Sequence, residues 1–180
     1  MWKLSIIFLL CSVALVAQLQ KYGVGRAATA EDIRSLGASV GPDGEGLPPG
    51  SGTAAAGREV YRSKCAGCHG AKGEGASAAP LVGGNGTLNT AKPLKTVGSY
   101  WPYATTLWDY IDRAMPFNQP GRLTSPEVYS AVAYVLYLNG IASENLVLDA
   151  KSLPRIKMPN RDGFVSDPRP DVMKKAEPIR

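Results

Sequence analysis

Cys65-Ala66-Gly67-Cys68-His69 is the most informative stretch of the sequence, and it has the pattern C-x-x-C-H. The two intervening residues place the thiols about one helical turn apart, and the imidazole directly follows the second thiol. In this pattern the thiols add to the two vinyl groups of a haem, and the histidine reaches the iron from one side. The stretch therefore predicts one covalently attached haem c, held by Cys65 and Cys68, with His69 as an iron ligand.

Two other kinds of site share part of this pattern. A structural zinc site needs four ligands, but the sequence has three cysteines and one histidine, and Cys11 lies in a distant apolar segment. A thioredoxin-like redox pair is expected next to a βαβ unit, whereas the stretch from Ala54 to Arg62 is typical of a helix. Both alternatives are therefore less favoured than haem.

Composition and charge limit the size of the fold and its partners. The chain has 180 residues, enough for one modest domain with extensions, and its 20 glycines and 14 prolines indicate many loops. The formal charge is +5, but no run of Lys and Arg is interleaved with aromatic residues. Nucleic acid is therefore excluded as a partner, and the positive balance favours docking to an acidic protein surface.

The N-terminal residues 1–20 are typical of an export signal. Lys3 precedes an apolar run from Leu4 to Leu19, which is shorter than the roughly 20 residues that a spanning helix needs. Cleavage after Ala17 and retention as an uncleaved membrane anchor both remain open, and only the second would attach the protein to a membrane. Because haem c is attached outside the cytoplasm, we expect a periplasmic protein.

The rest of the chain divides into an arm at 21–51, a haem domain at 52–145 and an extension at 146–180. The arm is rich in turns, with a brief helix expected over 30–36 and Thr29 as its cap. The apolar start of the extension, Leu146 to Leu148, is expected to pack on the haem domain. Beyond Leu153 the residues are rich in proline and show no periodicity. Basic residues outnumber acidic ones there, so this part is either a disordered tail or an arm that wraps a partner subunit.

Helical patterns predict an all-α, cytochrome c-like haem domain. A first helix over 53–64 places Gly57 and Tyr61 on one face, and a second is expected over 104–114. A capping box, a threonine followed by a glutamate three residues later, starts a last helix at Thr124. Tyr134 in this last helix is placed to meet the small residue and the aromatic residue of the first helix, where the two helices would cross closely.

Counting the possible ligands points to the second axial ligand of the iron. His69 is the only histidine, so two histidines from this chain cannot bind one iron. Pro116 ends the preceding helix and presents the thioether of Met115 from a loop. Met158 is the alternative, but it follows the last helix, where the haem fold should already be complete. Met115 is therefore the predicted ligand.

Several stretches together resemble a known family. They are Tyr61 to Gly70, Ala79 to Gly86, Thr96 to Leu107, Met115 to Phe117 and Met158 to Phe164. They resemble class I c-type cytochromes of bacterial sulfur oxidation, above all the cytochrome subunits of Sox sulfane-sulfur dehydrogenases and of periplasmic molybdenum sulfite dehydrogenases. Some relatives carry two haems, and the single C-x-x-C-H of this chain resembles a monohaem version.

The resemblance also implies further contacts of the haem. It implies that the Pro80 carbonyl accepts the Nδ1 proton of His69, which would fix the imidazole tautomer. Trp101 and Tyr103 are expected to pack on the haem edge and to hydrogen-bond a propionate. For Trp108, in the expected helix over 104–114, packing in the core is favoured over contact with the haem.

The function that the resemblance implies is electron transfer rather than catalysis. The chain would accept electrons from a molybdenum-cofactor dehydrogenase subunit and pass them to a downstream cytochrome or oxidase, with His/Met ligation raising the potential relative to bis-His. A freestanding electron shuttle is one alternative. A haem enzyme with an open iron is less favoured, because the sequence offers no second histidine and no free cysteine after the signal for acid–base work.

Overall fold

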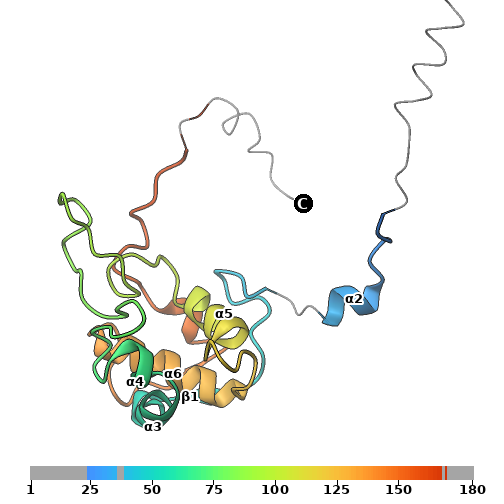
Figure 1. Ribbon diagram of the computed structural model, residues 1–180, viewed down its shortest axis with the longest axis horizontal. Coiled ribbons are helices and arrows are strands. Elements are labelled where there is room, and N and C mark those ends of the chain that lie inside the picture. Colours follow the sequence, from blue (N-terminus) through green and yellow to red (C-terminus); the bar gives the residue numbers. More distant parts are fainter. Residues whose placement is uncertain (1–23, 36–38, 168, 170–180) are drawn as a thin grey trace, which may run out of the picture. The chain divides into compact units, whose positions relative to one another are not determined.

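The computed structural model describes residues 24–35, 39–167 and 169, which belong to two separate units. The expected signal or anchor at 1–20 lies outside the described residues. Among the residues that are described, no helix is both long enough and apolar enough to cross a membrane. The unit that begins at Ser39 contains the C-x-x-C-H motif and the helices predicted around it (Figure 1).

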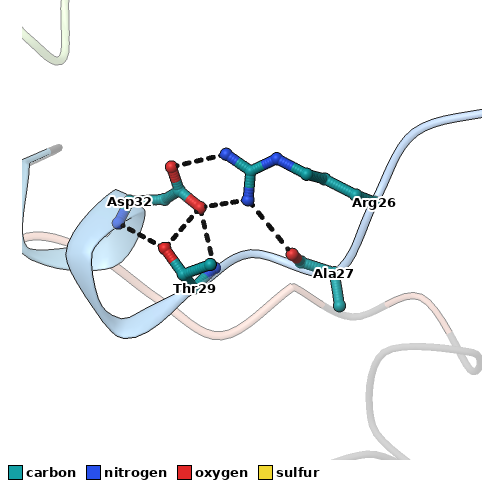
Figure 2. Close-up of polar contacts among 4 residues, drawn as sticks. All are labelled: Arg26, Ala27, Thr29 and Asp32. Carbon is teal, nitrogen blue, oxygen red and sulfur yellow. Dashed lines mark hydrogen bonds and ion pairs between the residues drawn. The ribbon is translucent and has the colours of Figure 1, made fainter.

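The first unit contains the short helix α2 (Ala30–Ser35), whose start is held by polar contacts (Figure 2). The Asp32 amide donates to Thr29 Oγ1 at 3.1 Å, and the Thr29 amide donates to Asp32 Oδ2 at 2.7 Å. Arg26 donates to both carboxylate oxygens of Asp32, at 2.5 and 2.7 Å. The Arg26 hydrogen bonds, followed by those from Thr29, hold the pKa of Asp32 well below its usual range. The predicted cap at Thr29 is confirmed.

In the described part of the second unit, the regular structure is helical apart from one pair of very short strands. In chain order its elements are β1 (Ser51–Gly52), α3 (Ala54–Lys64), α4 (Ala66–His69), α5 (Ala104–Ala114), α6 (Ser125–Leu138), β2 (Leu148–Asp149) and the 3-10 helix η1 (Leu153–Arg155). The two strands pair antiparallel, with Gly52 opposite Leu148, and so join the start of the haem domain to the extension. The helices confirm the predicted fold class.

Side-chain caps explain why α3 and α6 begin where the sequence predicts. The Thr53 hydroxyl accepts the Ala56 amide at 3.3 Å and caps α3. At the start of α6, the Thr124 amide and hydroxyl both donate to Glu127 Oε2 at 2.7 Å, which completes the predicted capping box. These bonds satisfy amides that the first turn of a helix cannot pair internally.

Helices α3 and α6 cross closely because Gly57 has no side chain. A Cβ built on Gly57 would lie 1.9 Å from the carbonyl oxygen of Ser130 in α6. Beside this crossing, the rings of Tyr61 and Tyr134 pack with their centroids 5.2 Å apart. Helix α3 contacts both α6 and α4, the turn that carries the motif, and these elements are labelled in Figure 1.

The segment before the predicted haem helices also packs on the domain. The Val40 amide donates to Asp109 Oδ1 in α5 at 3.0 Å, and the Tyr129 hydroxyl donates to the Pro48 carbonyl at 2.9 Å. These bonds place the chain from 40 to 48 against α5 and α6. Burial raises the pKa of Tyr129 to about 12, so its phenol remains a hydrogen-bond donor at neutral pH.

The extension packs on the domain at its apolar start, as the sequence predicts, and continues to do so beyond Leu153. Leu148, Leu153 and Met158 are at most 1% exposed and belong to the core. Farther along, the Asn160 side chain donates to the Tyr100 carbonyl at 2.8 Å. The segment beyond Leu153 packs through isolated side chains on an irregular backbone. Its sequence therefore shows neither the period of a helix nor that of a strand.

Substitution at the α3–α6 crossing tests its role in stability. We expect Gly57→Val to lower the free energy of unfolding by at least about 2 kcal/mol, because the new side chain would collide with backbone of α6. Ala55→Val is the control, since Ala55 is exposed in the same helix and the same new side chain there costs only helix propensity, less than about 1 kcal/mol. Thermal or denaturant unfolding followed by circular dichroism measures both. Equal losses in the two variants would contradict the close crossing.

Candidate functional site

The C-x-x-C-H motif forms a single turn of helix, α4, directly after α3. The amides of Cys68 and His69 donate to the Cys65 carbonyl at 3.1 and 3.0 Å. Cys65 is partly buried, and burial, with a smaller contribution from Cys68, raises the pKa of its thiol to about 11. Cys68 is exposed. The turn thus presents two thiols and one imidazole toward the same cavity.

This cavity has a volume of about 390 Å³ and lies between α3, α4, α5 and α6. Its wall is mainly apolar and consists of Tyr61, Ser63, Lys64, Cys65, Gly67, Cys68, His69, Leu81, Val97, Trp101, Leu107, Tyr110, Ile111, Met115, Pro116, Phe117, Asn118, Leu123, Ala131 and Val135. The volume falls within the range of about 300–1,000 Å³ that is usual for ligand pockets. A largely apolar group therefore suits this space.

A glycine-rich loop after α4 folds back onto the motif and orients His69. The Ala78 amide donates to the Cys68 carbonyl at 2.9 Å, and the Gly75 amide donates to the His69 carbonyl at 2.7 Å. This return places the Ala79 carbonyl 2.8 Å from His69 Nδ1. With Nδ1 protonated and donating to Ala79, Nε2 is left as the free lone pair for a metal.

The expected role of Pro80 needs correction. The carbonyl that accepts from His69 belongs to Ala79, one residue earlier, and Pro80 does not line the cavity. The physical reason is the register of the loop, because backbone bonds to the motif from Gly75 and Ala78 determine which carbonyl faces the imidazole. Pro80 instead packs close to Gly75, where a Cβ would lie 3.1 Å from the Pro80 nitrogen.

Met115 lies on the cavity wall at the end of α5. Its amide makes the last bond of the helix, to the Ile111 carbonyl at 3.0 Å, and its own backbone is extended. The helix cannot continue because Pro116 has no amide hydrogen. Met158 is buried in the core at 1% exposure and is not part of the cavity wall. Between these two methionines, the structure brings only Met115 together with the motif.

The two aromatic residues predicted to contact the haem differ in position. Trp101 lines the cavity, and its ring meets that of Tyr110 edge to face at a centroid distance of 5.8 Å. Tyr103 does not line the cavity; the Arg161 guanidinium lies over its ring, 4.4 Å from the centroid. Trp108 is 3% exposed and packs against Tyr129, as expected for a core residue.

Two tyrosines of the wall are not among the site residues that the sequence predicts. Tyr61 is expected from the sequence only to pack between helices, but it also lines the cavity and donates its hydroxyl to the Gly70 carbonyl at 2.9 Å. Tyr110 was not singled out. Tyr110 lies three residues after Leu107, which is also on the wall. Residues three apart in a helix are neighbours on its surface, so this spacing could have indicated that Tyr110 faces the cavity.

Comparison with known proteins identifies the family. The profile of cytochrome c oxidase, cbb3-type, subunit III matches residues 52–135, and no curated protein gives a significant match. A chain in the crystal structure of the sulfane dehydrogenase SoxCD from Paracoccus pantotrophus is 40% identical, with a TM-score of 0.75, over 89% of this chain and 81% of that one. The chain belongs to the c-type cytochromes.

The residues around the cavity fit the haem c that this family implies. Two thiols stand on one helical turn, an imidazole has its Nδ1 already hydrogen-bonded, and a thioether lies on the wall formed by the end of α5. A Cβ added at Gly67, between the thiols, would meet no atom within 4 Å, so the space beside the turn is open. This cytochrome thus offers the donor set of a His/Met haem c site.

Replacing each methionine by alanine tests which one binds the iron. We expect Met115→Ala to abolish the long-wavelength sulfur-to-iron charge-transfer absorption of the ferric protein, because the thioether is lost. Met158→Ala should retain that absorption and instead destabilise the fold by about 2–5 kcal/mol, because it leaves a cavity in the core. Absorption spectroscopy and thermal unfolding of both variants measure the two effects. Loss of the band in Met158→Ala alone would contradict the assignment to Met115.

Proposed function

We propose that this chain is a periplasmic monohaem cytochrome that carries electrons from a molybdenum-cofactor sulfite or sulfur dehydrogenase subunit to a downstream cytochrome or oxidase. The observation that carries the proposal is the apolar cavity with the C-x-x-C-H turn on one wall and Met115 on another. The similarity to a chain of the sulfane dehydrogenase SoxCD supports the choice of partner. In this complex the substrate chemistry takes place on the partner subunit.

Each residue of the site has a separate task in this proposal. Cys65 and Cys68 would hold one haem through thioether bonds, and His69 and Met115 would bind its iron. When bound, the haem supplies a one-electron iron couple, whose potential His/Met ligation raises relative to two histidines. Trp101, which lines the cavity, would pack against the group. Tyr61, whose pKa burial raises to about 12, keeps its proton and holds the Gly70 carbonyl beside the motif.

The wall of the cavity favours electron transfer over catalysis at the iron. Apart from the motif itself, the ionisable side chains on the wall are those of Tyr61, Lys64 and Tyr110. None of these is a carboxylate or a second imidazole, which are the usual proton-transfer groups at neutral pH. With both axial positions filled by side chains, the iron offers no free coordination site to a substrate.

Ligand binding distinguishes this closed site from an open one. We expect the ferrous protein to bind carbon monoxide, and the ferric protein to bind cyanide, slowly and incompletely at neutral pH, because each must displace Met115. In Met115→Ala, carbon monoxide binding should be fast and stoichiometric, since the position is vacated. Stopped-flow absorption in the Soret region measures the rates. Fast stoichiometric binding by the unmodified cytochrome would overturn the electron-carrier proposal in favour of a haem enzyme.

The partner is tested by isolating the cytochrome from its native host under mild conditions. We expect a molybdenum-containing subunit to co-purify in stoichiometric amount, and sulfite or a sulfane-sulfur substrate to reduce the haem within that complex. The cytochrome alone should not be reduced by the same substrates, because it has no site for their chemistry. Isolation as a free monomer that several unrelated donors reduce equally well would favour the freestanding shuttle instead.

A further inference from the structure

A cluster of polar side chains lies just outside the cavity, where three segments of the chain meet. It consists of the buried Thr96 and Ser99, which are 2% and 5% exposed, and the partly buried Asn139 at the end of α6. The cavity wall includes none of the three, but Asn139 bonds to the carbonyls of the wall residues Leu81 and Val135. We propose that this polar cluster positions the loop that carries Ala79, and through that loop sets the hydrogen bond to His69.

Asn139 joins three parts of the domain through one side-chain amide. Its Nδ2 donates to the carbonyls of Leu81 and Val135, at 3.1 and 2.9 Å. Both of these residues line the cavity, and Leu81 lies two residues after Ala79. On its other side, Asn139 Oδ1 faces Gly98 so closely that a Cβ there would lie 2.1 Å from it. The amide therefore fixes the end of the Ala79 loop against α6.

Thr96 and Ser99 hold the next part of the same loop. The Thr96 hydroxyl donates to the Gly83 carbonyl at 2.7 Å. Ser99 Oγ accepts the Thr96 amide at 2.9 Å and donates to the Leu94 carbonyl at 2.7 Å. Contact is tight here, because a Cβ at Gly84 would lie 2.1 Å from the Leu94 carbonyl oxygen. Two successive points of the loop, at 81 and 83, are thus tied to neighbouring segments.

These ties matter because the Ala79 carbonyl is the hydrogen-bond acceptor of His69 Nδ1. Such an outer bond raises the basicity of the ligating nitrogen and fixes the orientation of the ring. If the loop shifts, this bond weakens and His69 donates less charge to the metal. Electron donation by a ligand stabilises ferric iron more than ferrous iron. Weaker donation by His69 therefore destabilises the ferric state relative to the ferrous state, and the reduction potential should rise. This inference rests on His69 being an iron ligand, as in the proposed function.

Isosteric substitutions test the cluster in the haem-loaded protein. Thr96→Val removes the hydroxyl that bonds to Gly83, and Asn139→Leu removes both amide donors at similar volume. We expect each to shift the one-electron equilibrium constant toward the reduced state by threefold to tenfold, where tenfold corresponds to about 59 mV. Thr96→Ser, which retains the hydroxyl, should restore the wild-type potential. Thr90→Val is the matched control, because the exposed Thr90 hydroxyl bonds only to nearby backbone, donating to the Thr87 carbonyl and accepting from the Lys92 amide.

A second readout reports on His69 itself. In nuclear magnetic resonance spectra of the ferrous protein, the His69 Nδ1 proton should exchange faster with solvent in Thr96→Val and Asn139→Leu than in wild type. Ser99→Ala, a smaller change in the same cluster, provides the measurement if either variant folds poorly. Lower thermal stability with an unchanged potential and unchanged Nδ1 exchange would overturn the inference, and so would a fall in potential. A wild-type protein without a haem c spectrum would overturn the proposed function instead.

Discussion

The hydrogen bond from His69 Nδ1 to the Ala79 carbonyl is the contact on which the rest of the site depends, because it decides which ring nitrogen is free to bind iron. The bond requires the chain to reverse direction within ten residues of the motif. Gly70, with φ of +83°, begins that reversal in a backbone conformation that other residues rarely adopt. Since the sequence has no other histidine, no second imidazole could replace His69 if the loop were displaced.

The cavity in turn depends on how closely α3 approaches α6. Gly57 allows the two backbones to touch at Ser130, and the C-x-x-C-H turn that follows α3 then shares the cavity wall with Ala131 and Val135 of α6. Helix α5 provides the other wall, including Leu107. The apolar side chains of the wall face open space and therefore lack van der Waals contacts on that side. We therefore expect filling of the cavity by haem to contribute much of the packing energy of this domain.

Much of this arrangement could be predicted from the sequence because local rules decide it. The end of α5 follows from the proline after Met115, and the start of α6 from the capping box at Thr124. Contacts between distant segments could not be predicted in the same way. The acceptor of His69 differs from the expected Pro80 by one residue, because its identity depends on loop bonds that no short pattern encodes. Similarly, Tyr103 meets Arg161 of the extension, whose path has no periodic signal.

The two methionine–proline pairs show most clearly where sequence reasoning stops and geometry begins. Met115-Pro116 and Met158-Pro159 have the same local chemistry, so a thioether followed by a helix-breaking residue cannot distinguish them. Their difference lies in what each side chain faces. Met115 is presented to the cavity from the end of a helix whose own residues form the wall, whereas Met158 is enclosed by the core. To reach the iron, Met158 would have to leave that core and give up its packing, while Met115 already lies on the cavity wall.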